Sequence, residues 1–416
     1  MNRDEALQFL DDPKRYGSDT DPALLRASLK RLGSPESGCT MIHLAGTNGK
    51  GSTGAYLCSL LEASGETAGH FTSPHVLDFL ERIRIGGENC DPETFARAAA
   101  FVKERLQDMD RFEELRAFSL QLFTALVAFR NAGVRFAVIE AGIGGRDDAT
   151  NVLIPRVSVL TPVGLDHIPR LGTSLEEIAR HKAGIMKPGV PVFSARQEPV
   201  VETIFTAAAR VCGARLTYLP KTAVELVSSD PSGVRFRWDH THLLHTRMGG
   251  AYQAENAGLA ILVAEHLIGP LPEDTLRQGI LSARMPGRRQ LVCDDPPVVV
   301  DGAHNRHAIA ALCREKKTDR HRIGIIGMMQ DKETEEVVGL WKNCFDTLYL
   351  VPVEDERSWD PLRVSEQYLS DHPDCHVFSS LEEALAEGLR HKDALLLIAG
   401  SLYLAGEALN YFRTTA

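Results

Sequence analysis

The stretch that decides the fold reads Gly46-Thr47-Asn48-Gly49-Lys50-Gly51-Ser52-Thr53. An apolar run at residues 41–45 precedes it and a helical pattern at 53–63 follows it, so a strand, a glycine-rich loop and a helix succeed one another. Glycines let successive backbone N–H groups converge on phosphate oxygens at a helix N-terminus. The stretch therefore predicts a phosphate-binding loop, and we expect all eight residues to contact the nucleotide.

Two side chains of this loop have chemistry of their own. Lys50 is expected to neutralise the β- and γ-phosphates, and the hydroxyl of Ser52 is placed to bind Mg²⁺. The spacing is a variant, because Gly51 separates the lysine from the serine and position 44 holds Leu44 where the common pattern has glycine. A plain glycine-rich turn therefore stays open as an alternative.

Composition and charge narrow the class of protein. The chain has 416 residues, of which 44% are apolar and 25% charged, as expected for two or three globular domains. Its formal net charge of −10 and pI near 5.9 argue against a nucleic-acid partner. No stretch approaches the roughly 18 apolar residues of a membrane span, and the eight cysteines form no Cys-x-x-Cys pair. We expect a cytoplasmic protein with reduced thiols and no membrane partner.

Strand and helix patterns alternate along the chain, which predicts an α/β fold with parallel sheets covered by helices. Strands are expected at 136–140 and 157–161, and a β excursion is expected at 223–248 around the turn Asp230-Pro231-Ser232-Gly233. Asp294-Asp295-Pro296-Pro297 is predicted to mark a domain boundary. We expect an ATP-binding domain at 1–293 with a mostly parallel sheet, and a smaller, doubly wound, Rossmann-like α/β domain at 297–416, with strands at 298–300, 322–327, 347–351 and 394–398.

Several motifs together resemble one family. The loop at 46–53 is similar to the signature of folylpolyglutamate synthases and dihydrofolate synthases, within the Mur ligase superfamily. Other matching segments follow in the same order: Thr72-Ser73-Pro74-His75, Glu81-Arg82-Ile83-Arg84, 140–151, Leu165-Asp166-His167, 177–185, Pro286-Gly287-Arg288, Asp301-Gly302-Ala303-His304-Asn305 and Gly400-Ser401-Leu402-Tyr403. The joint match extends over nearly the whole chain and is far more specific than any one motif.

This resemblance implies an ATP-dependent ligase that joins L-glutamate to dihydropteroate, to a folate, or to both. The acceptor carboxylate would pass through an acyl phosphate, and ADP and phosphate would be released. The expected partners are these small molecules, and the expected oligomeric state is a monomer. The choice between the two acceptors and the number of glutamates added stay open.

Candidate metal ligands come partly from chemistry and partly from the resemblance. Glu140 ends an apolar strand at the carboxyl edge, where ligands bind in open α/β sheets, and carboxylate oxygen suits Mg²⁺. The resemblance implies two magnesium ions and adds Ser73 and His167 as ligands of the second ion, beside Glu140. Imidazole prefers softer metals, so an ordinary histidine is the alternative for His167.

Lys182 is the third catalytic candidate, with Lys50 and His167. The resemblance implies that this lysine reacts with carbon dioxide to form a carbamate, which turns a cation into an anion that faces magnesium. Carbamylation needs the neutral amine, so the site must lower the pKa of the lysine. The alternative is a solvated lysine near the end of a helix.

The remaining nucleotide contacts are implied by the resemblance alone. It assigns Asn256 to the adenine side, Arg288 to phosphate, and Asp301 with His304 to the ribose and base. ATP would then lie between the two domains, and domain closure would exclude water. A polar helix surface for Asn256, a helix cap for Asp301, and Arg289 in place of Arg288 remain alternatives.

One departure from the family is visible at Phe118-Ser119, where the family usually has Phe-Glu. A contact on the pterin side would then be absent, mediated by water, or supplied by Glu113 or Glu114. The alternative is a plain amphipathic helix at 113–129 that packs Phe118 and its helical neighbours inward.

Two other functions compete with this one. A Mur-type peptidoglycan precursor ligase would share the fold and the phosphate loop but use a nucleotide-sugar substrate. A nucleotide-dependent switch protein would also need a phosphate loop and magnesium. A GTPase would carry an Asn-Lys-x-Asp motif, and the sequence contains no Asn-Lys dipeptide.

Overall fold

The computed structural model describes residues 1–17, 21–314, 320–332 and 335–415. Its contacts group the chain into two compact units. The first comprises Met1–Glu225, Arg237–Leu244 and Ala254–Arg284, and the second comprises Leu226–Phe236, His245–Gln253 and Met285–Ala416. None of the described helices is both long enough and apolar enough to cross a lipid bilayer.

The first unit is built on an eight-stranded sheet in the order β4-β3-β2-β5-β1-β6-β7-β8. Its strands are β1 (Thr40–Ala45), β2 (Ala68–Phe71), β3 (Ile83–Ile85), β4 (Glu88–Asn89), β5 (Phe136–Glu140), β6 (Val157–Leu160), β7 (Val192–Ser194) and β8 (Leu216–Tyr218). All neighbouring pairs are parallel except β2–β3 and β3–β4. The mostly parallel sheet is confirmed. Leu44 pairs with Glu140, so β1 and β5 end at the same edge.

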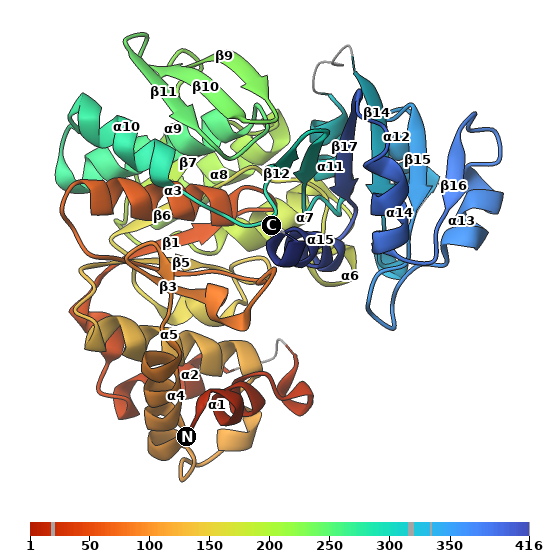
Figure 1. Cartoon of the computed structure of the whole chain (residues 1–416). Helices are drawn as coiled ribbons and strands as arrows, with labels where there is room; N and C mark the ends of the chain where they lie inside the picture. The colour runs from red at the N-terminus through yellow and green to blue at the C-terminus, as the bar shows by residue number, and fades with distance from the viewer. Residues whose placement is uncertain (18–20, 315–319, 333–334, 416) are drawn as a thin grey trace. The chain divides into compact units, whose positions relative to one another are not determined.

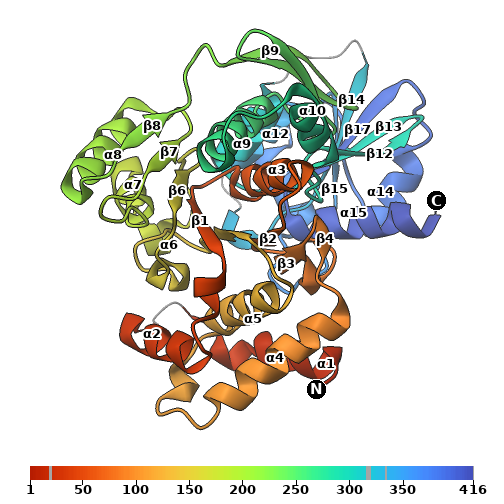
Figure 2. The ribbon, with the colours of Figure 1, turned by 90° about the vertical axis from the view of Figure 1, so that its left-hand side faces the viewer.

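Helices cover both faces of this sheet. Figures 1 and 2 show α3 (Lys50–Ala63), α9 (Gln253–Ile268) and α10 (Glu273–Ser282) on one face of the central strands. The opposite face carries α1 (Arg3–Leu10), α2 (Pro22–Arg31), α4 (Pro92–Leu106) and α5 (Ala117–Asn131). Three further helices follow β6 and β7, namely α6 (Ile168–Leu171), α7 (Leu175–Ala183) and α8 (Pro199–Cys212). A side chain at Gly69 of β2 would lie 2.7 Å from the Phe129 ring of α5, so glycine permits this close packing.

Helix α5 corrects one expectation. The predicted amphipathic helix at 113–129 was wrong, because α5 begins at Ala117 and Glu113 and Glu114 lie in the separate short helix η4 (Phe112–Glu114). Nearly every residue of α5 from Leu120 to Phe129 is buried, so the helix has no solvated face over that stretch. Packing against α4 and against the sheet explains this burial.

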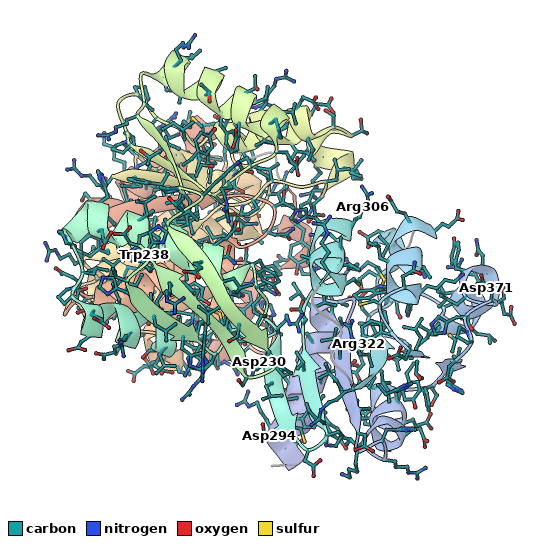
Figure 3. The ribbon with its side chains drawn as sticks, turned by 90° about the horizontal axis from the view of Figure 1, so that it is seen from above. Asp230, Trp238, Asp294, Arg306, Arg322 and Asp371 are labelled. Atoms are coloured by element: carbon teal, nitrogen blue, oxygen red, sulfur yellow. The ribbon has the colours of Figure 1, made fainter. Side chains whose placement is uncertain are left out.

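The predicted β excursion is confirmed as a three-stranded sheet in the order β11-β10-β9. It contains β9 (Val224–Asp230), β10 (Gly233–Trp238) and β11 (His242–Thr246). Asp230 lies at the turn end of the β9–β10 hairpin (Figure 3). Its carboxylate accepts a hydrogen bond from the Ser232 N–H at 2.8 Å, which tightens the predicted turn.

The second unit contains a six-stranded sheet in the order β12-β13-β17-β14-β15-β16. The strands are β12 (Gln290–Asp294), β13 (Pro297–Val300), β14 (His321–Ile326), β15 (Thr347–Leu350), β16 (Cys375–Val377) and β17 (Ala394–Ala399). Only β12 runs antiparallel to its neighbour. The stretch 294–297, which the sequence suggests as a boundary, forms the hairpin between β12 and β13, with the turn at 295–296 and Asp294 at the end of β12 (Figure 3).

Both faces of this sheet are covered, as a doubly wound arrangement requires. The helices are α11 (Arg306–Cys313), α12 (Glu335–Lys342), α13 (Pro361–Tyr368), α14 (Leu381–Gly388) and α15 (Leu402–Thr415). Leu395 and Leu397 of β17 share a core with α11, α12 and α13. Leu396, which points to the other face, packs on α14 at Gly388.

One carboxyl group in the first unit is held in an unusual state. Glu62, near the end of α3, is half-buried, and its Oε1 has no hydrogen-bond partner within the described part of the chain. Burial raises the pKa of Glu62 to about 7, and the nearby Arg84 guanidinium and Gly87 N–H oppose that shift only in part. The fold therefore favours the protonated acid.

We expect Glu62→Gln to stabilise the protein increasingly between pH 5 and pH 8. The folded-state pKa lies above the unfolded value, so the protonated acid contributes full stability at low pH, and this contribution is lost as pH rises through about 7. Glutamine keeps the neutral form at every pH. Thermal unfolding at several pH values measures the effect, with the exposed Glu104→Gln as a charge-matched control. A difference in Tm between variant and wild type that does not change with pH would contradict the prediction that Glu62 has a raised pKa.

Candidate active site

The phosphate loop connects β1 to α3 at the carboxyl edge of the first sheet. Helix α3 begins at Lys50, three positions earlier than the predicted start, because Gly49 adopts a left-handed conformation (φ 84°) as its N-cap. A side chain at Gly46 would lie 1.8 Å from Thr161 Oγ1. Glycine is therefore required at both positions, by backbone conformation at one and by close approach at the other.

Lys50 points back over the loop. Its Nζ donates to the carbonyl oxygens of Gly46 (3.1 Å) and Thr47 (3.4 Å) and lies 3.7 Å from Glu140 Oε1. The loop is also fixed from outside, since the Thr47 hydroxyl donates to the Gly164 carbonyl at 2.9 Å. These contacts hold a cation at the edge of the sheet.

Glu140 occupies the predicted place at the end of β5 and is buried. It accepts a short hydrogen bond from the Thr72 hydroxyl and faces Lys50. Ser73 follows Thr72 directly, and Ser52 is buried in the first turn of α3. The structure thus brings Glu140 together with Lys50 and with the segment that carries Ser73.

This donor set fits magnesium. Within the described ranges no group of three or more histidine, cysteine, aspartate or glutamate side chains could hold a metal. One carboxylate and the hydroxyls of Ser52 and Ser73 are hard oxygen donors. Mg²⁺ is commonly bound by one or two carboxylates, with water and substrate phosphates completing its coordination. Such a site needs few protein ligands.

Lys182 lies in α7 and is 3% exposed. Its Nζ donates to the Gly46 carbonyl at 2.7 Å, so the Nζ groups of two lysines share one loop oxygen. Burial lowers the pKa of Lys182 well below its ordinary value, and the charge of Lys50 lowers it further, while Asp166 and Asp148 oppose the shift. The alternative of a solvated lysine is wrong.

A cavity of about 650 Å³ lies in the first unit. Ser73, Phe118, Ser119 and His167 all line it, and so do the basic side chains Arg82, Arg116 and Arg170 and the carboxylates Asp147 and Asp148. His167 is exposed and has a left-handed backbone (φ 49°) as the N-cap of α6. The cavity wall therefore carries two of the predicted metal ligands, Ser73 and His167.

The departure at Ser119 falls inside this cavity. Ser119 is 1% exposed, and its hydroxyl has no hydrogen-bond partner among the residues that the structure describes. Phe118 packs on Phe71 with ring centroids 5.4 Å apart. Glu113 and Glu114 instead form ion pairs with Arg15 and Arg111, each at 2.7 Å. Neither glutamate lines the cavity.

Asn256 lies in α9 beside the phosphate loop. It is 5% exposed, and a side chain at Gly49 would come within 2.6 Å of its Oδ1. The alternative of a helix-surface residue is wrong for Asn256. The side-chain amide of Asn256 therefore lies next to Gly49 of the phosphate loop.

The other nucleotide candidates cluster in the second unit. Asp301 is buried and accepts hydrogen bonds from the N–H groups of Ala303 (2.7 Å) and Arg289 (3.0 Å). A Cβ atom added at Gly302 would lie 2.9 Å from Arg288 Nη1, so this guanidinium lies beside the glycine. His304 Nδ1 lies 2.8 Å from the Gly302 carbonyl oxygen. The helix cap of α11 is Asn305, so the cap alternative for Asp301 is wrong.

Comparisons with known proteins show which family the chain belongs to. Residues 44–264 match the Mur ligase middle domain, and residues 287–402 match the Mur ligase glutamate ligase domain. The chain is 34% identical to the folylpolyglutamate synthase of Lacticaseibacillus casei, and it is 30% identical to the dihydrofolate synthase/folylpolyglutamate synthase of Bacillus subtilis. Each match covers 97% of both chains. The chain belongs to the folylpolyglutamate synthase/dihydrofolate synthase family.

A solved relative supports the same conclusion for the fold. The E. coli FolC structure, in complex with DHPP and ADP, superposes with a TM-score of 0.85 at 27% identity and covers 100% of this chain and 98% of its own. Members of this family are ATP-dependent ligases, and so is this enzyme. The Mur ligases that act on peptidoglycan precursors share only the broader superfamily.

Sequence reasoning missed several residues of this ligase site. Thr72 belongs to a matching motif, but its contact with Glu140 joins positions 68 residues apart and leaves no local pattern. Asp148 lies in another matching motif, and only the folded chain shows that it lines the cavity. Thr161 ends a predicted strand, and its side chain makes the small residue at Gly46 necessary.

Proposed function

We propose that this ligase transfers the γ-phosphoryl group of ATP to the carboxylate of dihydropteroate or of a reduced folate. The resulting acyl phosphate is attacked by the α-amine of L-glutamate, and an amide forms while phosphate leaves. The observation that carries the proposal is the convergence of Lys50, Lys182 and Glu140 on the phosphate loop, next to a cavity lined by Ser73. The relatives' names and the DHPP complex support the acceptor class.

The loop residues 46–53 are proposed to hold the phosphates of ATP. Backbone N–H groups at the start of a helix such as α3 favour an anion, and Lys50 would add a positive charge. Asn256, which touches Gly49, is proposed to act on the nucleotide side of the loop. Arg288, Asp301 and His304 remain our proposed contacts to phosphate, ribose and base.

Two magnesium ions are part of the proposal. Ser52 and Glu140 would hold the first, and Ser73 with Glu140 and His167 would hold the second. When bound, the ions neutralise charge that develops on the phosphoryl oxygens. The protein groups position the reactants, with Glu140 Oε1 3.7 Å from Lys50 Nζ, so the proposed catalysis rests on positioning and charge neutralisation rather than on a protein nucleophile.

Lys182 is proposed to act as a carbamate. The neutral Nζ attacks carbon dioxide, a new N–C bond forms, and the amine proton leaves to solvent. The low pKa of Lys182 supports this step because only an unprotonated amine is nucleophilic. The product is an anion beside the phosphate loop, where it would attract the positive charge of Lys50.

The cavity is proposed to bind the acceptor. Phe118 offers an aromatic surface for a flat ring, and Asp148 offers a carboxylate acceptor for ring N–H groups. The arginines at its wall suit an anionic substrate on a protein with net charge −10.

The compartment and assembly state are also proposals. All eight cysteines are free thiols in the structure, as is usual in a reducing compartment, and ATP is an intracellular substrate. We propose that the enzyme works in the cytoplasm as a monomer.

We expect phosphate release to require ATP, glutamate and a pteridine acceptor together. Omitting either co-substrate should lower the rate at least about tenfold, because attack on the acyl phosphate completes turnover. A phosphate-release assay on purified protein measures this with dihydropteroate, tetrahydrofolate or a peptidoglycan precursor as acceptor. Rapid ATP hydrolysis that no acceptor changes, or turnover only with the peptidoglycan precursor, would refute the proposal.

For Lys182, both Lys182→Ala and Lys182→Arg should lower kcat at least about a hundredfold, because neither can carry the carbamate. Acetate or formate should partly restore Lys182→Ala by supplying the anion. The arginine variant is the matched control, since it keeps a cation that can donate to Gly46. An active Lys182→Arg enzyme, or an active wild type whose ¹³C spectrum shows no carbamate with labelled bicarbonate, would remove the carbamate from the mechanism.

Ser119→Glu should change acceptor preference. A carboxylate at this buried position adds an acceptor for ring N–H groups, so the ratio of kcat/KM for dihydropteroate to that for tetrahydrofolate should shift at least about fivefold. Ser119→Ala is the control and should leave the ratio unchanged, because the hydroxyl has no partner in the described structure. An unchanged ratio in an equally stable Ser119→Glu enzyme would exclude this position from acceptor selection.

A further inference from the structure

Three buried polar groups form a chain of hydrogen bonds between β1 and the loop that follows β5. His43 lies inside β1 and is 1% exposed, and its Nε2 is 2.8 Å from the hydroxyl of Thr150, which is fully buried. That hydroxyl donates to Asp148 Oδ1 at 2.5 Å. Asp148 lines the cavity. A histidine three positions before the phosphate loop is thus joined to the acceptor side of the site.

The donors in this chain can be assigned. The Thr150 hydroxyl has one proton and gives it to Asp148, so its oxygen must accept from His43, and Nε2 must carry the imidazole proton. Nδ1 has no hydrogen-bond partner among the described residues, which agrees with a ring that donates on one side only. Burial lowers the pKa of His43 to about 3, so the ring is neutral.

The cavity wall depends on where Asp148 is held. Asp148 Oδ1 also accepts from the Thr150 N–H at 2.9 Å, and Oδ2 accepts from the Ile143 N–H at 3.0 Å. A side chain at Gly142 would lie 3.3 Å from Asp148 Oδ2 and 3.0 Å from the Phe118 ring. The carboxylate and the aromatic ring therefore both lie close to Gly142, and a shift of Asp148 alters this part of the wall.

We infer that His43 and Thr150 are positioning residues for the acceptor: the Nε2–H of His43, acting through the Thr150 hydroxyl, fixes the Asp148 carboxylate as a hydrogen-bond acceptor in the cavity wall. The inference rests on the proposed function. Neither residue touches substrate. Removing the hydroxyl frees the His43 end of the chain and leaves a buried imidazole N–H without an acceptor.

Thr150→Val tests the role, because valine has the same shape and lacks the hydroxyl. We expect KM for the acceptor to rise about tenfold, while KM for ATP and for glutamate stay within about twofold. Thr150→Ser keeps the hydroxyl and should behave like the wild type. A Thr150→Val enzyme with a lower Tm and three unchanged KM values would show a structural role only and overturn the inference.

The tautomer of His43 gives a second test, which needs no substrate and is measured on the wild-type enzyme. In wild-type enzyme with ¹⁵N-labelled histidine, the His43 signal should show a protonated Nε2 and an unprotonated Nδ1 near pH 7.5, with His43→Gln used for assignment. A protonated Nδ1 would reverse the chain of donors and overturn the inference. This result is independent of the proposed function, which fails instead if the wild type turns over neither pteridine acceptor.

Discussion

The carbonyl oxygen of Gly46 accepts hydrogen bonds from the Nζ groups of two lysines, and the rest of the site depends on this contact. Lys50 reaches it from the first turn of α3, and Lys182 reaches it from α7, 136 positions away. Lys182 is almost fully buried, and this burial together with the charge of Lys50 lowers its pKa well below the ordinary value. The contact therefore places a buried lysine that favours the neutral form beside the lysine that begins α3. Perturbed pKa values of this kind cluster at functional sites.

Packing around the phosphate loop places these groups at the edge of the sheet. Gly46 has no side chain, so Thr161 at the end of the neighbouring strand can come close, and the left-handed Gly49 lets α3 begin at Lys50. Glu140 enters the same edge because β5 pairs in register with β1. Parallel strands bring their carboxyl ends together, so a cation, a carboxylate and a helix N-terminus meet without any long-range sequence signal.

Much of the fold could be predicted because its signals are local. β5 runs over the predicted residues 136–140, since an apolar run there is closed by a charged residue at the sheet edge. Features that depend on tertiary packing could not be predicted from the sequence. The burial of α5 on nearly all sides follows from α4 and the sheet, and the turn at 294–297 resembles an exposed linker until β12 pairs with β13. Prolines and acidic residues are as suitable for a hairpin turn as for a boundary.

The site also contains residues that local motifs predict and residues that only tertiary contacts reveal. Lys50, Glu140 and Lys182 could be proposed as candidates because each stands in a motif, and the structure places all three around the loop. His43 gave no signal, since one polar residue within an apolar strand looks like an interruption of the pattern. Its partner lies 107 positions later, and only the folded sheet brings the two together. A buried imidazole N–H costs stability unless it has a hydrogen-bond acceptor, so His43 fits the interior of β1 because the Thr150 hydroxyl accepts from it.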